Sequence, residues 1–364
     1  MNILFIAPLS PPITGQSLAA EVLLNELNKL HFVKVINFRK DNFSQGMNSF
    51  ARILKILGIL LKLVITKNSA DVIYLTISQS LAGNIKDLFT YLICFRKLDR
   101  MLIHLHGGGI RKLIFNKNKF LFNINNFFLK RVRGGIVLGE SLRPVFKGII
   151  PNGKLYVIPN FAEDYLFLTK KEIKEKHKKN RQLNILFLSN LIQGKGHDEL
   201  VGVYQKLDKS RQSMISIDFA GDFESTEQKN IFLKKIMKYK NINYHGVVKG
   251  DQKRDLFFKA HIFCLPSYYL YEGQPISILE AYASGCVVVT TDHGGIKDVF
   301  RHGVNGYEVK KRSIESLEKT LLWIAENTDK LLPIALSNRN IAFKKYRVIH
   351  YLSSFHELLE DIAA

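Results

Sequence analysis

The feature that most constrains the fold is a repeated alternation of short apolar runs with segments of helical periodicity. The runs predicted to form strands are residues 2–8, 71–76, 101–105, 135–138, 155–158, 183–190, 215–220, 242–244, 262–265 and 287–292. Helical spacing of apolar residues separates several of them, for example over residues 85–96. Because helices connect the strands, the strands are expected to run parallel, with helices on both faces. The sequence therefore predicts an α/β protein with doubly wound parallel sheets.

The length and composition indicate a globular chain of two domains. A chain of 364 residues is long enough for two separate cores, and 46% hydrophobic content is typical of globular proteins. Cys94, Cys264 and Cys286 each lie in apolar surroundings without paired metal spacing, which favours buried thiols in a reducing cytosol. Residues 2–8 lack a basic start and are soon followed by prolines, so we expect a strand there rather than a signal peptide.

The formal net charge of +21 predicts an anionic partner. The chain has no zinc-finger spacing, no basic region with heptads and no aromatic RNA-binding strand, so no nucleic-acid partner is expected. Residues 50–66 are too short and too charged to span a bilayer, but Arg52, Lys55 and Lys62 share one arc of an otherwise apolar helix. Two interpretations stay open: a helix lying on an anionic membrane surface, and a core helix with a thin solvated face.

Two glutamates flank the start of a predicted helix in the second half of the chain. Glu272 lies in a loop after the strand at 262–265, and helical spacing after Pro275 places Glu280 about one turn into the helix. The intervening segment contains Gly273, Gln274, Pro275, Ile276 and Ser277. A helix N-terminus attracts phosphate and a carboxylate accepts hydrogen bonds from hydroxyls, so the stretch suits a nucleotide-sugar. The alternative interpretation is that Glu272 is an ordinary charged loop residue and Glu280 an ordinary solvated helix residue.

This stretch resembles the Glu-x7-Glu motif of the retaining glycosyltransferases of family 4, which have the two-domain GT-B fold. Similar sequence follows in the expected order: Leu-Glu-Ala-Tyr-Ala-Ser-Gly around Glu280, then residues 294–298 and 303–306. The resemblance is strong over residues 183–310 and loose over residues 1–165. It implies two Rossmann-like domains facing across a cleft: 1–167 for the acceptor and 183–344 for the nucleotide-sugar. Residues 168–182 are then a surface linker, and a helix at about 345–364 crosses back onto the first domain.

The resemblance also implies roles for individual residues in transferring a sugar from a nucleotide diphosphate donor. Glu272 is expected to hold the donor sugar, Glu280 the ribose hydroxyls, and Lys195 the departing diphosphate together with the N–H groups of residues 273–277. His106, at the end of the strand at 101–105, is expected to contact the sugar near the reacting carbon. His104, two residues earlier, is interpreted as a core residue.

Two positions depart from the family pattern. Asn190 stands where an arginine is usual, so one cation on the pyrophosphate is replaced by a neutral amide. Only Gly15 matches the two glycines of the first phosphate loop, since Gln16 replaces the second. Ser17 is expected to cap the helix that follows this loop.

Other catalytic motifs are incomplete. His-Gly-Gly-Gly at 106–109 resembles a hydrolase oxyanion loop, but the chain has no Gly-x-Ser-x-Gly. Residues 148–155 match a P-loop until Leu155, which replaces the required Ser or Thr. No Asp-x-Asp triplet occurs, so neither a metal nor another cofactor is expected.

The identity of the acceptor is predicted only from the net charge and from the family resemblance. A lipid-linked sugar on the inner face of the cell membrane fits the +21 charge and the helix at 50–66, which predicts a cytoplasmic, peripheral enzyme of surface polysaccharide synthesis. UDP-sugars are the commonest donors of the resembling family. Two alternatives remain: a nucleotide-sugar epimerase of the GT-B fold, and a non-catalytic basic protein that binds nucleic acid or membrane.

Overall fold

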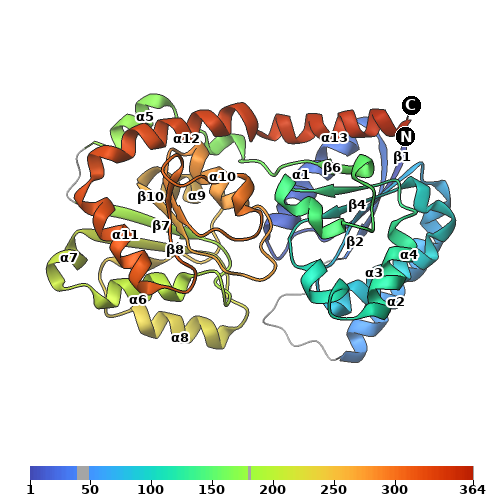
Figure 1. The fold of residues 1–364 in the computed structure, drawn as a ribbon, viewed down its shortest axis with the longest axis horizontal. Helices are drawn as coiled ribbons and strands as arrows, with labels where there is room; N and C mark the ends of the chain where they lie inside the picture. Colours follow the sequence, from blue (N-terminus) through green and yellow to red (C-terminus); the bar gives the residue numbers. More distant parts are fainter. Residues whose placement is uncertain (39–48, 179–181, 364) are drawn as a thin grey trace. The chain divides into compact units, whose positions relative to one another are not determined.

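The computed structural model describes residues 1–38, 49–178 and 182–363, with side chains described outside residues 49–56 and 363. Its contacts divide the chain into two compact units, Met1–Pro159 and Asn160–Ala364. Each unit contains one six-stranded parallel sheet with helices (Figure 1). The expected fold class, two doubly wound parallel α/β sheets, is therefore confirmed.

The sheet of the first unit has the strand order β2-β1-β3-β4-β5-β6. Its strands are β1 (Asn2–Ala7), β2 (Phe32–Asn37), β3 (Val72–Thr76), β4 (Met101–Leu105), β5 (Gly134–Val137) and β6 (Leu155–Val157). Its longer helices are α1 (Gly15–Leu30), α2 (Ser49–Thr66), α3 (Leu81–Ile93) and α4 (Lys119–Leu129). Every residue of β3, β4 and β5 is buried, which explains why these strands are continuous apolar runs in the sequence.

A capping box fixes the start of α1. The Thr14 hydroxyl accepts a hydrogen bond from the Ser17 N–H at 3.1 Å, and the Ser17 hydroxyl accepts one from the Thr14 N–H at 2.9 Å. Thr14 is therefore the N-cap, and the expectation that Ser17 caps the helix is wrong by three residues. Gly15 is the first residue of the helix.

The sheet of the second unit has the strand order β12-β11-β10-β7-β8-β9. Its strands are β7 (Leu183–Leu188), β8 (Ile215–Ala220), β9 (Ile242–Tyr244), β10 (Ile262–Leu265), β11 (Val287–Thr290) and β12 (Gly306–Glu308). Its helices are α5 (Lys170–Lys176), α6 (His197–Lys206), α7 (Lys209–Ser213), α8 (Thr226–Ile236), α9 (Gly250–Lys259), α10 (Ile276–Ala283), α11 (Ile314–Glu326), α12 (Leu331–Lys345) and α13 (Val348–Ala363). Strand β10 is fully buried at the centre of this sheet, and the loops that follow it and its two neighbours form the site described below.

The lysine-rich segment around residue 170 differs from the surface linker expected. It contains helix α5, whose Ile173 and Lys176 side chains are buried. The Lys176 Nζ donates to the backbone carbonyls of Phe257 at 2.9 Å and Ser284 at 2.8 Å. A lysine can be buried in this way when its aliphatic stem packs against apolar groups and its amine finds acceptors.

Short helical segments connect these elements: η1 (Lys67–Ser69), η2 (Phe95–Arg100), η3 (Arg111–Phe115), η4 (Glu140–Phe146), η5 (Asn152–Lys154), η6 (Asp164–Leu166), η7 (Gly294–Asp298) and η8 (Thr328–Lys330). Among the helices in the described residues, none has the length and hydropathy needed to cross a bilayer.

Candidate functional site

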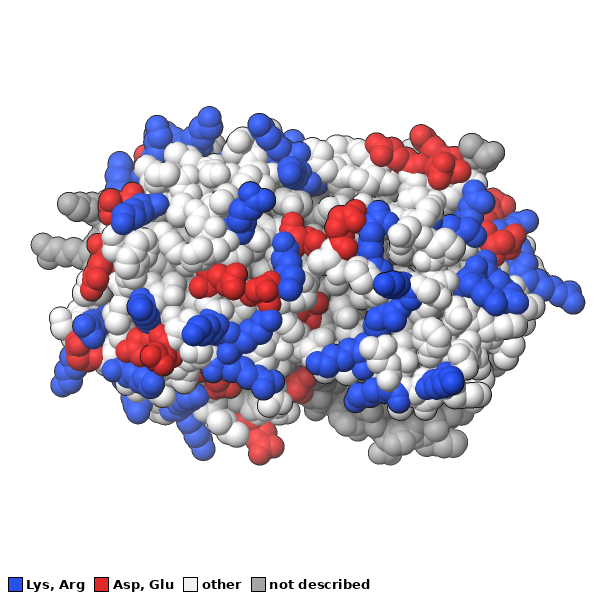
Figure 2. All heavy atoms as spheres, in the orientation of Figure 1, with Lys and Arg blue, Asp and Glu red and all other residues white. Residues whose placement is uncertain are grey.

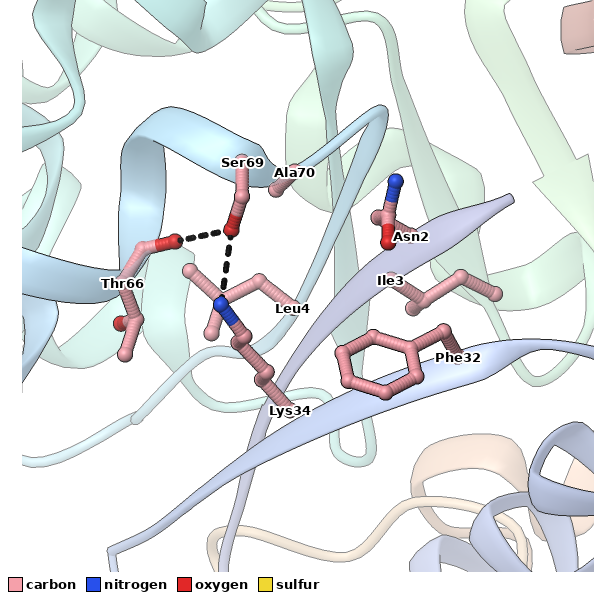
Figure 3. A pocket seen from close by; sticks show the side chains of 8 residues that line it. All are labelled: Asn2, Ile3, Leu4, Phe32, Lys34, Thr66, Ser69 and Ala70. Atoms are coloured by element: carbon pink, nitrogen blue, oxygen red, sulfur yellow. Dashed lines mark hydrogen bonds between the residues drawn. The ribbon is translucent and has the colours of Figure 1, made fainter.

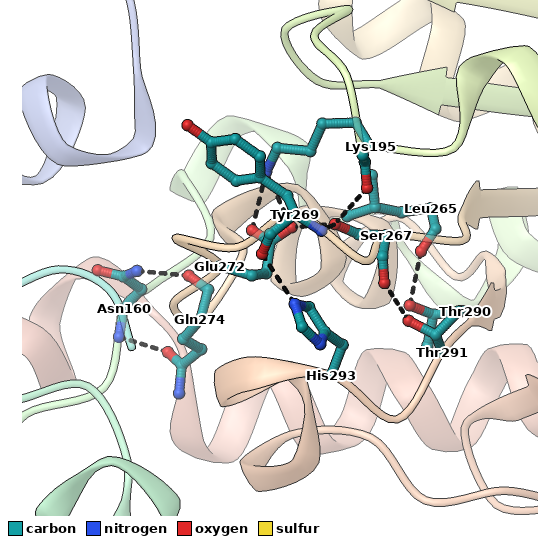
Figure 4. A network of polar contacts seen from close by, with 11 residues as sticks. Asn160, Lys195, Leu265, Ser267, Tyr269, Glu272, Gln274, Thr290, Thr291 and His293 are labelled. Carbon is teal, nitrogen blue, oxygen red and sulfur yellow. Dashed lines mark hydrogen bonds and ion pairs between the residues drawn. The ribbon is translucent and has the colours of Figure 1, made fainter. Parts of the chain in front are cut away.

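Three loops meet at the carboxyl edge of the second sheet. They follow β7, β10 and β11, which are neighbours in the sheet with β10 in the middle. Parallel strands bring their carboxyl ends to one edge, where open α/β sheets usually bind ligands. The loops carry Lys195 after β7, Ser267 to Glu272 after β10, and Thr291 and His293 after β11 (Figure 4).

An ion pair between Lys195 and Glu272 forms the centre of this site. The Lys195 Nζ lies 2.8 Å from Glu272 Oε1 and 2.9 Å from Oε2, and the Glu272 residue is only 5% exposed. The Ser267 hydroxyl also donates to Glu272 Oε2. The Tyr269 ring covers the amine, with its centroid 4.8 Å from Nζ (Figure 4). Two residues that are 77 positions apart in sequence are thus held in one geometry.

Backbone contacts fix the loop that carries Glu272. The His293 Nε2 donates to the Tyr269 carbonyl at 2.8 Å, and the Thr291 hydroxyl donates to the Ser267 carbonyl. Gly294 has a φ of +53°, and a Cβ at this position would lie 2.5 Å from the Glu272 carbonyl oxygen. The loop after β11 can therefore approach Glu272 closely only because position 294 is glycine.

Helix α10 begins just after Glu272. Pro275 is its N-cap residue, and none of the side chains that the structure describes caps the helix. The N–H groups of Ile276 and Ser277 therefore point out of its N-terminus without a described side-chain acceptor. Gln274 is 4% exposed, and its side-chain oxygen accepts from the Asn160 N–H at 2.6 Å. The Asn160 side chain in turn donates to the Gln274 carbonyl at 2.7 Å. The Gln274 side chain thus anchors the segment that leads into α10.

Glu280 lies on α10 and has a different cationic partner from Glu272. It is 1% exposed, and its Oε1 is 2.5 Å from the Nζ of Lys253 on α9. Burial raises the pKa of the Glu280 carboxyl, while the Lys253 charge opposes that rise. Lys253 also lies 3.0 Å from Glu163.

The sequence did not single out Lys253 or Glu163. The sequence feature that could have identified Lys253 is its position in α9, where it falls on the same buried face as Leu256 and Phe257. A lysine on an apolar helix face needs a buried anionic partner, and that requirement could have marked it.

The site lies in a region of the chain that matches a known family. Residues 169–339 match the family described as glycosyl transferases group 1, and this region contains Lys195, Glu272, Glu280 and Lys253. This match identifies the second unit of the chain as a group 1 glycosyltransferase domain. The match ends before α13 and begins after β6, so it covers most of the second unit.

Curated relatives share limited identity with the chain. An uncharacterized glycosyltransferase of Methanocaldococcus jannaschii is 25% identical over 230 residues, which cover 63% of this chain and 55% of the relative. The amylovoran biosynthesis glycosyltransferase AmsK of Erwinia amylovora is 28% identical over 109 residues, 29% of this chain and 27% of AmsK. The alignments with the first curated relatives span about half of those proteins' lengths.

Solved structures resemble the chain over nearly its whole length. HepE of Anabaena, solved in complex with UDP and glucose, has a TM-score of 0.75 at 18% identity and 99% coverage of both chains. WaaG, a glycosyltransferase involved in lipopolysaccharide biosynthesis, has a TM-score of 0.69 at 14% identity, covering 94% of this chain and 95% of WaaG. These likenesses show the GT-B fold.

The two residues expected to contact the donor in the first unit lie directly after β4 and at the start of α1. His106 follows β4, and its ring lies against that of His104 with centroids 3.9 Å apart. Burial lowers the pKa of His106 to about 3, so its imidazole is neutral at pH 7. Within the described residues, its Nε2 is buried without a hydrogen-bond partner. Gly15 opens α1 after β1.

His104 is fully buried, and its Nδ1 lies 2.7 Å from the Tyr74 hydroxyl. This fits the interpretation of His104 as a core residue.

Asn190 lies two residues after the end of β7. Its carbonyl accepts from the Ile192 N–H at 3.0 Å and shapes the turn that leads to Lys195. Among the described residues, no cluster of three or more His, Cys, Asp or Glu side chains could hold a metal ion.

A surface depression in the first unit lies at the edge of its sheet where the strands begin. Asn2 and Phe32, at the starts of β1 and β2, line it (Figure 3). Lys34 donates to the Ser69 hydroxyl there at 3.0 Å. Because it lies at the amino ends of the strands, it does not share the usual ligand-binding position of an α/β sheet.

Proposed function

We propose that this protein transfers a sugar from a nucleotide diphosphate donor, with retention of anomeric configuration, and that the donor is a UDP-sugar. The observation that carries the proposal is the Lys195–Glu272 pair beside the uncapped N-terminus of α10. A cation, an anion and free N–H groups at one sheet edge match the phosphate and the hydroxyls of such a donor. The structures of HepE with UDP and with UDP-glucose support UDP as the first nucleotide to test.

Lys195 is assigned to the departing diphosphate. An ammonium group has three N–H donors, and Glu272 accepts two hydrogen bonds from it, which leaves one for a phosphate oxygen. The N–H groups of Ile276 and Ser277, with the positive end of the α10 dipole, add to the stabilisation of the negative charge that develops there. Asn190 supplies at most a neutral hydrogen bond in this proposal, so Lys195 is the main cation on the leaving group.

The remaining donor contacts follow from the chemistry of each side chain. Glu272 accepts hydrogen bonds from sugar hydroxyls, and Glu280 accepts them from the ribose. His106 is neutral, so its buried Nε2 offers the sugar a hydrogen bond without adding charge. Gly15, at the N-terminus of α1, is assigned to the donor phosphate. Gln274 acts indirectly, by anchoring the segment that leads into α10.

We propose a lipid-linked acceptor at an anionic membrane surface. The described part of α2 exposes Leu57, Leu61, Val64 and Ile65, each between 46% and 80% exposed. This exposure argues against the alternative of a core helix. Arg52 and Lys55 lie outside the described side chains, so the cationic arc expected on this helix is described only at Lys62.

Helix α3, which packs against α2, adds a second exposed apolar row. Leu81, Ile85, Phe89 and Leu92 are between 45% and 59% exposed and recur at helical spacing. An apolar surface of this kind on a basic protein fits the interface of an anionic bilayer. The relatives named for amylovoran and teichuronic acid biosynthesis support a role in making a surface polysaccharide.

Thermal stabilisation by a panel of nucleoside diphosphates tests the donor assignment. Ligand that binds only the folded protein raises the melting temperature, and UDP is expected to give the largest rise. Lys195→Ala should remove most of this rise, whereas Lys240→Ala, which changes an exposed lysine in the same unit, should retain it. If no nucleoside diphosphate shifts the wild-type melting temperature, the proposed function is refuted.

A further inference from the structure

Lys253 joins two carboxylates through its amine. Helix α9 places the side chain on its buried face, and the residue is 8% exposed. The Nζ lies 2.5 Å from Glu280 Oε1 and 3.0 Å from Glu163 Oε2. Glu163 also accepts a hydrogen bond from the Tyr165 hydroxyl at 3.2 Å. The four side chains therefore form one polar chain that begins at the buried Glu280 and ends at the half-exposed Tyr165.

Lys253 is the one cation among the described titratable groups that act on Glu280. These groups are Lys253 on α9 and Glu163 immediately before η6. Burial disfavours a negative charge on Glu280, and the Glu163 carboxylate disfavours it further. A buried carboxylate that loses its only cation becomes protonated rather than remaining charged.

The same contact leaves part of the Glu280 carboxylate available. Lys253 binds Oε1, and in the described part of the chain Oε2 has no hydrogen-bond partner. An ionised carboxylate has acceptor capacity on both oxygens, whereas a protonated one uses one oxygen as a donor. Lys253 therefore controls whether Glu280 presents an acceptor to a ligand hydroxyl.

We propose that Lys253 is a positioning residue for the nucleotide, because it holds the Glu280 carboxylate charged and oriented so that its free oxygen accepts a hydrogen bond from a ribose hydroxyl of the donor. The inference rests on the proposed function, in which Glu280 binds the ribose. Lys253 does not contact the reacting atoms. Its effect is selectivity for ribonucleotides over deoxyribonucleotides.

Lys253→Met is the direct test, because methionine keeps an apolar side chain of similar length and removes the cation. Without the cation, burial leaves Glu280 protonated at pH 7, and the ribose loses a charged acceptor. A hydrogen bond to a charged group corresponds to a loss of UDP affinity of about 10- to 100-fold. Affinity should return as the pH rises through the new pKa of Glu280, because ionisation restores the acceptor. Wild-type affinity should change little over the same range.

The measurement is calorimetric titration of wild type and Lys253→Met with UDP and with 2′-deoxyuridine diphosphate, from pH 6 to pH 9. At pH 7 the variant should lose affinity for UDP but little affinity for the deoxynucleotide, so the ratio of the UDP affinity to the deoxynucleotide affinity should fall. At pH 9 this affinity ratio should recover. Lys253→Arg, which keeps the charge, should preserve the affinity ratio. Glu163→Gln should also preserve it, because the Lys253–Glu280 contact remains.

Lys253→Gln provides a second variant if the methionine variant does not fold, since it keeps a hydrogen-bond donor and removes the charge. It should show the same pH-dependent loss of selectivity. An unchanged UDP preference at pH 7 would overturn the inference, and so would equal loss for both nucleotides at every pH, which indicates a structural role. Absence of binding of either nucleotide to the wild type would instead overturn the proposed function, and this inference with it.

Discussion

Three lysines in the second unit are largely or fully buried, and each is satisfied by a different set of acceptors. Lys195 binds one carboxylate, Lys253 binds two, and Lys176 binds two backbone carbonyls and lies 3.2 Å from the Cys286 sulfur. Burial opposes the charge on Lys253, but Glu280 and Glu163 outweigh this and raise its pKa. Burial lowers the pKa of Lys176, which has no carboxylate beside it.

The lowered pKa of Lys176 predicts a pH dependence of stability. Between that pKa and the ordinary lysine value of 10.5, the unfolded chain binds a proton that the folded chain does not. Stability from this residue therefore rises with pH across that window. Lys176→Met should remove this rise and cost about 1–3 kcal/mol, because the Phe257 and Ser284 carbonyls lose a buried donor.

Urea unfolding of wild type and Lys176→Met at pH 7 and pH 9 measures this effect. The difference in unfolding free energy between the two proteins should be larger at pH 9. Lys240→Ala, at an exposed position, should have the same unfolding free energy as the wild type at both pH values. A difference that stays constant or shrinks at pH 9 would contradict the assignment of the shift to Lys176.

At the scale of elements, interior strands were predicted well, and two edge strands were missed. The predicted bounds of β4 and β10 match the structure because both strands are fully buried and largely apolar. The bounds of β8 and β9 also match, although β8 contains partly buried polar residues and only Ile242 of β9 is buried. The edge strands β2, in which only Ile36 is buried, and β12, which has three residues, were not predicted.

Helix α5 and the contacts of Lys253 show a second limit of prediction from the sequence. The charged composition of residues 170–176 gave no sign that Ile173 and Lys176 would be buried, because burial depends on acceptors supplied by residues far along the chain. Glu272 and Lys195 were identifiable from a local motif, but their direct ion pair was not. The partners of Glu280 could not be read from the motif either, since Lys253 and Glu163 lie 27 and 117 positions away.

For the whole molecule, the basic charge is unevenly divided along the chain. Residues 1–159 contain 22 basic and 7 acidic residues, whereas residues 160–364 contain 31 and 25. Basic side chains are spread over the visible face in Figure 2, with smaller groups of acidic ones among them. The unit that carries the exposed apolar rows of α2 and α3 is therefore also the more basic one, as attraction to anionic lipid requires.

Vesicle binding tests the membrane proposal. The protein should sediment with phosphatidylglycerol vesicles and much less with phosphatidylcholine vesicles, and binding should weaken as salt is raised. Phe89→Glu, in the exposed row of α3, should reduce binding several-fold because it places an acid against the lipid. Ile231→Glu, at an exposed position on α8, should not. Equal binding by both variants, or no preference for anionic vesicles, would contradict the proposal.

The central claim is that Lys195, Glu272 and the N-terminus of α10 hold a nucleotide diphosphate sugar. A crystal structure of the protein with a UDP-sugar tests this most directly. We expect a diphosphate oxygen within about 3 Å of Lys195 Nζ and of an N–H at Ile276 or Ser277, and sugar hydroxyls hydrogen-bonded to Glu272. A diphosphate bound away from Lys195, with the Lys195–Glu272 pair facing only solvent, would contradict it.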